Sequence, residues 1–201
     1  MNKQIFFAHS GGPQGKPGQG SHDFVLRLRD ELEPEYTIHD PVIEDPDAPT
    51  YELWQEMFDR EFPKLADPVL LIGHSLGGST LLKYLSEETC GLQVAGLFLA
   101  APPYWGEGRW DAEDFTLRDD FSKTLPTIPE IHLYHCLKDP VVPVEHADFY
   151  QKLILTASIH KLNGNDHAFS DGLPVLVEHI KKLYINQQNN KWHADDTNTR
   201  K

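Results

Sequence analysis

The sequence has few cysteines, few basic residues and no long hydrophobic segment, and each shortage narrows its possible roles. Cys90 and Cys136 are the only cysteines in 201 residues, which argues against a disulfide framework and favours a reducing compartment. Lysine and arginine number 18 against 31 aspartates and glutamates, so at a net charge of −13 we expect neither nucleic acid nor a membrane surface as a partner. The apolar run at residues 5–8 is too short for a signal-peptide core or a membrane span. We therefore expect a cytoplasmic protein, and whether it is a monomer or a dimer stays open.

Short apolar runs alternate with segments of helical periodicity along most of the chain. The length suits one well-buried domain, expected over residues 1–185, whereas the polar tail 186–201 is expected to be disordered. Strands are expected near residues 4–9, 36–39, 69–73, 94–101, 131–137 and 158–162. This alternation predicts an α/β fold with about six mainly parallel strands flanked by helices, whose ligands bind at the carboxyl ends of the strands.

One stretch, residues 69–82, organises the rest. Four apolar residues lead into Gly73-His74-Ser75-Leu76-Gly77, and helix-forming sequence follows. A serine at the apex of a sharp strand-to-helix turn has its hydroxyl lifted clear of the sheet, because glycines on either side remove colliding side chains. Ser75 is therefore the candidate nucleophile. The alternative is a glycine-rich turn whose serine only caps the helix.

A second glycine-rich loop, residues 10–20, follows the first expected strand. Such loops often cradle phosphate, but the sequence does not match either nucleotide-binding pattern. Lys16 is followed by Pro17 where a P-loop needs Ser or Thr, and Asp23 stands where the dinucleotide fingerprint needs its third glycine. We therefore predict no nucleotide site and no cofactor.

An acid and a base follow two further strands. Asp139 comes after the expected strand 131–137, and His167 comes after the strand 158–162. A serine hydroxyl needs a base to remove its proton, and the base needs an orienting acid. Asp166 is the alternative acid, but adjacent side chains in an extended loop tend to diverge, so Asp139 is favoured.

No metal site is predicted from the histidine spacing. His132 and His135 lie three residues apart in one expected strand and so point to opposite faces. The other histidines show none of the usual metal-ligand spacings.

These motifs together resemble the α/β-hydrolase superfamily. Gly73-His74-Ser75-Leu76-Gly77, Asp139 before Pro140-Val141-Val142-Pro143, and Asp166-His167-Ala168-Phe169 stand in the superfamily's order of Ser, Asp, His. The size is similar to that of small serine hydrolases related to retinoblastoma-binding protein 9 and the bacterial YdeN-like group. The resemblance implies a single-domain α/β-hydrolase fold with a catalytic triad and an oxyanion hole made by the amides of Leu76 and Gly11, with Ser10 as the alternative to Gly11.

The long segment 104–128 would be a short insertion or small cap after the fourth strand. Its aromatic residues either anchor a surface helix or face a substrate. With Tyr104, Trp105 and Phe169 lining the acyl pocket, an uncharged substrate is favoured.

The predicted function is a cofactor-independent serine hydrolase that cleaves a carboxylic ester, or a thioester or amide, of a small molecule. The first alternative is an interaction or ligand-sensing protein that keeps the triad with little turnover. The second is a structural α/β domain in which the motif arose by chance.

Overall fold

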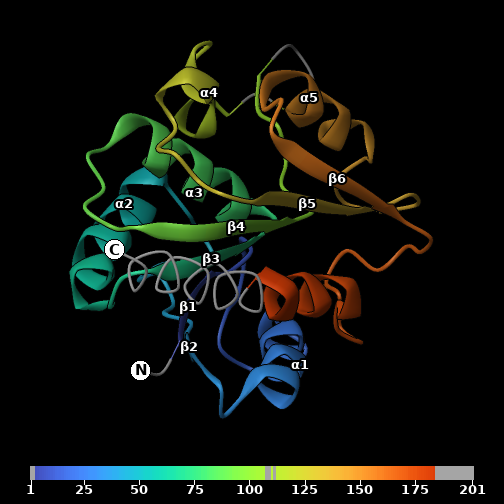
Figure 1. The fold of residues 1–201 in the computed structure, drawn as a ribbon. Coiled ribbons are helices and arrows are strands. Elements are labelled where there is room, and N and C mark those ends of the chain that lie inside the picture. The colour runs from blue at the N-terminus through green and yellow to red at the C-terminus, as the bar shows by residue number, and fades with distance from the viewer. Residues whose placement is uncertain (1–2, 107–109, 111, 184–201) are drawn as a thin grey trace, which may run out of the picture.

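The computed structural model describes residues 3–106, 110 and 112–183. Its centre is a 6-stranded sheet in the order β2-β1-β3-β4-β5-β6, and every neighbouring pair is parallel (Figure 1). The strands are β1 (Lys3–Ala8), β2 (Tyr36–His39), β3 (Val69–His74), β4 (Val94–Ala100), β5 (Ile131–Cys136) and β6 (Ala157–Leu162). The predicted α/β fold with a parallel sheet is confirmed, and each strand lies within two residues of its expected bounds.

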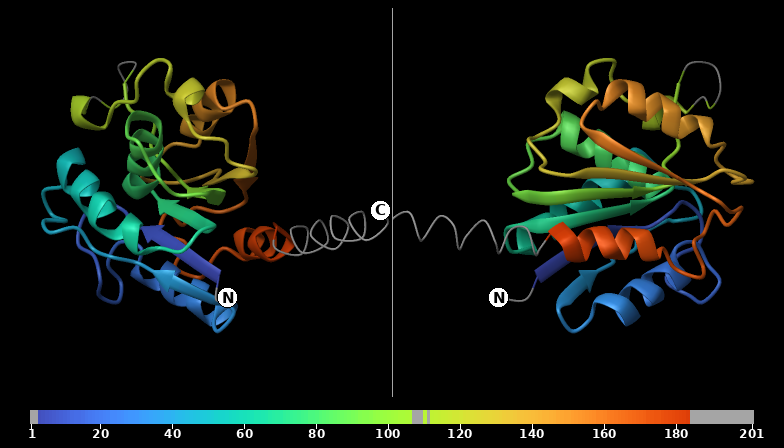
Figure 2. Two further views of the ribbon diagram at one scale, coloured as in Figure 1. Left: turned by 60° about the vertical axis from the view of Figure 1, so that its left-hand side comes forward. Right: turned by 45° about the vertical axis from the view of Figure 1, so that its right-hand side comes forward.

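Helices cover both faces of the sheet. The helices are α1 (His22–Leu32), α2 (Tyr51–Glu61), α3 (Leu76–Glu87), α4 (Phe121–Thr124), α5 (Glu145–Leu153) and a last helix at residues 174–183, with short 3-10 turns η1 (Phe62–Lys64) and η2 (Glu113–Phe115). In Figure 2, α1 and helix 174–183 lie on one side of the sheet, and α2, α3 and α5 lie on the other.

Two apolar clusters follow from this layering. The central strands β3, β4 and β5 are buried along their whole length, as expected for parallel strands covered on both faces. Successive residues of a strand point to opposite faces and so belong to different clusters. Leu133 lies in the cluster beneath α3, and Tyr134 lies in the cluster beneath α1. The edge strand β6 is only partly buried.

The segment after β4 is packed onto the body of the protein. Phe115 in η2 and Phe121 in α4 are buried in the cluster that contains α3. The aromatic residues of this segment thus supply core contacts for its described part. The domain boundary at residue 185 and the predicted disorder of residues 186–201 lie outside the described residues.

Candidate active site

Ser75 stands in a strained turn between β3 and α3. Its backbone has φ 50 and ψ −123, a region that residues other than glycine seldom occupy. Its amide donates a hydrogen bond to the carbonyl oxygen of Ala100 on β4, 2.8 Å away. This bond anchors the turn to the neighbouring strand, so the strained conformation is held by the sheet.

Two glycines make the turn possible. A Cβ on Gly77 would lie 2.2 Å from the carbonyl oxygen of His9, and a Cβ on Gly73 would lie 2.6 Å from the Cα of Gly78. Both distances are too short for any side chain. The glycines therefore let the first turn of α3 approach the ends of β1 and β3, as the motif predicted.

The structure brings Ser75, His167 and Asp139 into one hydrogen-bonded row. Nε2 of His167 is 3.0 Å from Oγ of Ser75, and its Nδ1 is 2.8 Å from Oδ2 of Asp139. The Asp139 side chain is fully buried, whereas the His167 side chain is 14% exposed. Three strand ends that lie far apart in sequence thus meet at one edge of the sheet.

Asp139 is held as an anion despite its burial. Burial alone would raise its pKa, but the hydrogen bond from His167 and those from the Val141 and Val142 amides together outweigh burial and lower the pKa below its usual value. Because both amides donate to Oδ1, Oδ2 is left to accept from Nδ1 of His167. This arrangement places the proton of the neutral imidazole on Nδ1 and leaves Nε2 able to accept a proton from Ser75.

The glycine-rich loop after β1 lies beside the first residue of α3. A Cβ on Gly11 would be 3.1 Å from Cδ2 of Leu76, so these two residues are in contact. The Leu76 amide is the first of its helix and has no acceptor within the helix. The Ser10 amide instead donates to Oγ of Ser21, 2.9 Å away.

Sequence reasoning missed the part played by His74. Its Nδ1 lies 2.7 Å from Oγ of Ser21, and its Nε2 lies 2.7 Å from the carbonyl oxygen of His167. The carbonyl can only accept, so Nε2 carries the hydrogen. Burial, with a smaller contribution from the neighbouring His167, lowers the pKa of His74 to about 3, so the His74 ring is neutral and its Nδ1 accepts from the Ser21 hydroxyl.

His74 therefore links the loop after β1 to the backbone of His167. The chain of hydrogen bonds runs from the Ser10 amide through Ser21 and His74 to the His167 carbonyl. The signal available in the sequence was a polar residue, His74, at the end of the apolar run of β3. Its partner Ser21 is 53 residues away, which no local pattern indicates.

Tyr104 and Trp105 are half-buried on the α3 side of the sheet. Nε1 of Trp105 donates to Oγ of Ser79, 3.0 Å away, and Ser79 lies one helical turn beyond Ser75. The Tyr104 ring stacks on Phe149, with ring centroids 5.3 Å apart. Trp105 thus approaches the turn that carries Ser75.

Phe169 has a different environment from the one expected. Its side chain is 4% exposed and its ring packs against Phe24 and His74 in the cluster beneath α1. The ring therefore belongs to the core and supports His74, and we do not include it among the residues of an acyl pocket.

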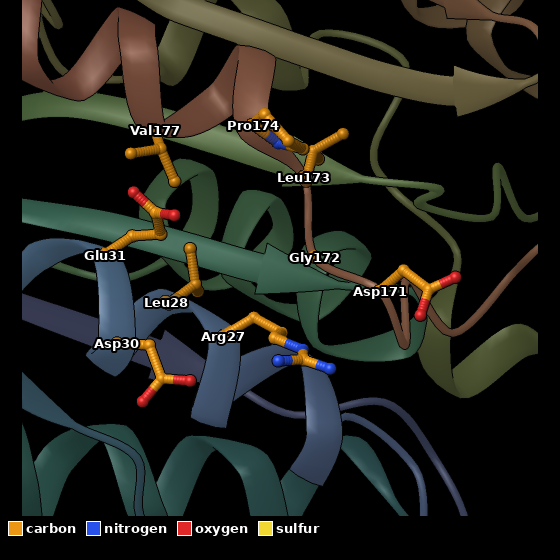
Figure 3. A pocket seen from close by; sticks show the side chains of 9 residues that line it. All are labelled: Arg27, Leu28, Asp30, Glu31, Asp171, Gly172, Leu173, Pro174 and Val177. Atoms are coloured by element: carbon orange, nitrogen blue, oxygen red, sulfur yellow. The ribbon is translucent and has the colours of Figure 1, made fainter.

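A cavity of about 230 Å³ lies away from these residues. It opens between α1 and the start of helix 174–183 (Figure 3). Its lining residues are Arg27, Leu28, Asp30, Glu31, Asp171, Gly172, Leu173, Pro174 and Val177. Ser75, His167 and Asp139 are not among them, so the hydrogen-bonded row, and not this cavity, defines the candidate active site.

A group of histidines also converges that the spacings along the chain did not indicate. His132, His160 and His179 each offer a ring nitrogen within 4.8 Å of the others. The prediction compared spacings along the chain, whereas these residues come from two paired strands and a helix. His132 and His135 do lie on opposite faces, since His132 stacks on Phe98 and His135 contacts Val142 and Asp139.

The parallel sheet, with a strained turn after β3 that places Ser75 beside His167 and Asp139, has the architecture of an α/β-hydrolase. Within that class the chain belongs to the Serine hydrolase family, which matches residues 28–171. Comparison with curated proteins gave no match. The resemblance noted in the sequence is thereby confirmed at the level of the family.

Solved structures support the same fold. The ydeN gene product of B. subtilis is 15% identical, with a TM-score of 0.70 and coverage of 91% of this chain and 99% of that chain. Est1E of Butyrivibrio proteoclasticus, solved with ferulic acid bound, is 15% identical, with a TM-score of 0.68 and coverage of 93% and 90%. A YdeN-like hydrolase of Pectobacterium atrosepticum is 15% identical, with a TM-score of 0.59 and coverage of 83% and 80%. Among the described residues, no helix has the length and apolar character needed to cross a membrane.

Proposed function

We propose that this serine hydrolase cleaves a carboxylic ester of a small molecule through an acyl-enzyme on Ser75. The observation that carries the proposal is the row of hydrogen bonds from Asp139 through His167 to Ser75, at 2.8 and 3.0 Å. These distances lie within the range over which a general base can take a proton from a nucleophile.

The reaction follows from the protonation states. Nε2 of His167 accepts the Ser75 proton as Oγ forms a bond to the acyl carbon, and the carbonyl electrons move to oxygen. The anion of Asp139 stabilises the resulting imidazolium and keeps it in place. His167 then gives the proton to the leaving alcohol as the ester bond breaks, and a water molecule repeats the sequence to release the acid.

The oxyanion is assigned to the amides of Leu76 and Gly11. Two observations support this choice over Ser10: Gly11 contacts Leu76, and the Ser10 amide already donates to Ser21. Loss of one such donor typically lowers the rate about 100- to 1,000-fold. Each chemical role has a group from the protein, so the proposed reaction needs no cofactor.

The substrate is proposed to be an uncharged small ester. Trp105 and Tyr104 would give the acyl side of the site an apolar surface near α3. The net charge of −13 disfavours polyanionic substrates such as nucleic acid.

A fluorophosphonate probe tests the nucleophile. We expect the native protein and the Ser86→Ala control to be labelled and Ser75→Ala to remain unlabelled. Ser86 lies near the end of α3, the helix that follows Ser75, and its hydroxyl donates to the Lys83 carbonyl. Equal labelling of Ser75→Ala would refute the assignment of the nucleophile.

Turnover of a series of nitrophenyl esters tests the reaction. We expect hydrolysis by the native protein and loss of kcat on His167→Ala. Labelling without turnover across the series would favour a ligand-sensing protein over an esterase, and unchanged turnover in His167→Ala would refute the assigned base.

A further inference from the structure

Three histidines gather on the sheet face that α1 and helix 174–183 cover. His132 is on β5, His160 is on the edge strand β6, and His179 is in helix 174–183. In the register of β5 and β6, His132 pairs with Ser158 and Tyr134 pairs with His160. His132 and Tyr134 have the same parity, so His132 and His160 point to the same face, where helix 174–183 lies (Figure 1).

The ring nitrogens are close enough to share one ion. Nδ1 of His132 lies 3.0 Å from Nε2 of His160, and one nitrogen of each of the three rings lies within 4.8 Å of the others. Metal–nitrogen bonds of about 2.0–2.1 Å in a tetrahedral site place ligand nitrogens roughly 3.3 Å apart. The first pair is thus nearly at ligand spacing. The His179 ring stacks on His132 with centroids 4.6 Å apart and planes 22° apart, so it must turn for its lone pair to face the ion.

Two further contacts orient the rings. Oε2 of Glu130 lies 3.0 Å from Nε2 of His132, so Nε2–H donates to the carboxylate and the lone pair of Nδ1 faces His160. Oη of the buried Tyr134 lies 2.8 Å from Nδ1 of His179, which leaves Nε2 of that ring as its ligand atom. Metal-binding histidines commonly use their second ring nitrogen in this way.

The protonation of the rings suits a cation. Burial, and the nearby His179 and His132, lower the pKa of His160 to about 4, and burial and His132 also lower the pKa of His179. Both rings are therefore neutral near pH 7, and neutral imidazole is the form that binds metal.

We propose that His132, His160 and His179 form a binding site for one divalent transition-metal ion, with Zn²⁺ as the ion to test first. Imidazole ligands suit Zn²⁺, Cu²⁺ and Ni²⁺, whereas Mg²⁺ and Ca²⁺ prefer oxygen ligands. Three protein ligands leave a fourth position of the tetrahedron for water.

The position of the site indicates a structural role. His132 is the second residue of β5, whereas Asp139 follows the carboxyl end of the same strand. The ion therefore binds on the face of the sheet, beside the first half of β5 and the middle of β6, and not at the carboxyl edge where Ser75 and His167 lie. It joins helix 174–183 to β5 and to the edge strand β6, and so stabilises the edge of the sheet.

Zinc binding by the full chain, without a histidine tag and after removal of metal by a chelator, tests the proposal. We expect one Zn²⁺ per chain by competition with a chromophoric chelator. Because the ion binds only the folded form, it raises Tm by about 5–10 °C at a hundredfold excess over Kd. Mg²⁺ should leave Tm unchanged.

Three variants and a control locate the site. His160→Gln and His179→Gln should each weaken Zn²⁺ binding by more than tenfold and abolish the rise in Tm. Glu130→Gln should weaken binding about 10- to 100-fold, as loss of an orienting partner does. His22→Gln, which removes a half-buried histidine outside the cluster, should bind as the native protein does.

Absence of stoichiometric Zn²⁺ binding by the native protein would overturn the proposal, as would binding of native strength in the folded His160→Gln and His179→Gln variants. If those variants fail to fold, the visible absorption spectrum of Co²⁺ added to the native protein tests whether the site exists. The intense visible absorption of tetrahedral Co²⁺ supports the site, and the weak spectrum of hydrated Co²⁺ refutes it.

Discussion

Replacement of Ser21 by alanine should destabilise this protein far more than the loss of one hydroxyl suggests. The Ser21 hydroxyl accepts from the Ser10 amide at 2.9 Å and donates to Nδ1 of His74 at 2.7 Å. Ser21 is fully buried, and Ser10 and His74 are 6% and 1% exposed. Alanine would therefore leave two buried polar groups without a partner.

The expected cost follows from those two groups. Each buried polar group that loses its partner costs about 1–3 kcal/mol, so Ser21→Ala should lower the free energy of unfolding by about 2–6 kcal/mol. This is a large share of the roughly 5–15 kcal/mol that stabilises a typical domain. The matched control is Ser86→Ala, since Ser86 is also buried but bonds only the Lys83 carbonyl within its own helix. We expect it to cost less than about 1 kcal/mol.

Urea unfolding followed by circular dichroism measures both variants at equal pH. A midpoint that falls with an unchanged slope reports stability alone. Because Ser21 also holds the loop that contains Gly11, kcat for ester hydrolysis should fall in the surviving folded fraction. If Ser21→Ala costs no more than Ser86→Ala, the hydrogen bonds assigned to His74 are wrong.

Further predictions concern pH and three single residues. The pKa of His74 is lowered from 6.5 to about 3. Between these pH values the unfolded chain binds a proton on His74 and the folded protein does not. Stability is therefore full above pH 6.5 and falls as pH drops toward 3, by up to about 1.4 kcal/mol per unit from this residue. In urea titrations at several pH values, His74→Gln should show a shallower decline; an equal decline would contradict the lowered pKa. Ser75→Gly should be about 1 kcal/mol more stable than Ser75→Ala, since glycine relieves the strain at φ 50; equal urea midpoints would show that the turn is unstrained. Asp139→Asn should fold but lose about 10⁴-fold in kcat, because the amide can donate to Nδ1 of His167 and favour the wrong tautomer; native kcat would exclude Asp139 as the acid. Gly77→Ala should not yield folded protein, because its Cβ would lie 2.2 Å from the His9 carbonyl; a native near-ultraviolet spectrum would refute this.

The positions of Ser75, Asp139 and His167 could be predicted because each follows a segment that the alternation of strands and helices identifies as a strand. In a parallel sheet all carboxyl ends lie on one edge, so three strand ends far apart in sequence indicate one site. The hydrogen-bonded row of these residues is consistent with that expectation. The glycines around Ser75 could be interpreted in the same way, because their effect is local to the turn.

Contacts between distant side chains could not be predicted in this way. Phe169 was expected at a substrate pocket from its place after His167, yet its ring packs on Phe24 and His74. Its backbone has a positive φ of 51, which is rare outside glycine, and its ring lies in the cluster beneath α1. No local pattern in the sequence indicates either feature.

The amino-acid sequence by itself determined the order of strands and helices, the turn at Ser75 and the strand ends that carry the acid and the base, because these depend on local periodicity and on glycine. Only the tertiary structure decided that Ser21 reaches His74 and that His132, His160 and His179 converge. Those contacts depend on strand register and on where a helix packs. Strand register and helix packing both result from the fit between whole apolar surfaces, and residue spacing along the chain does not indicate them.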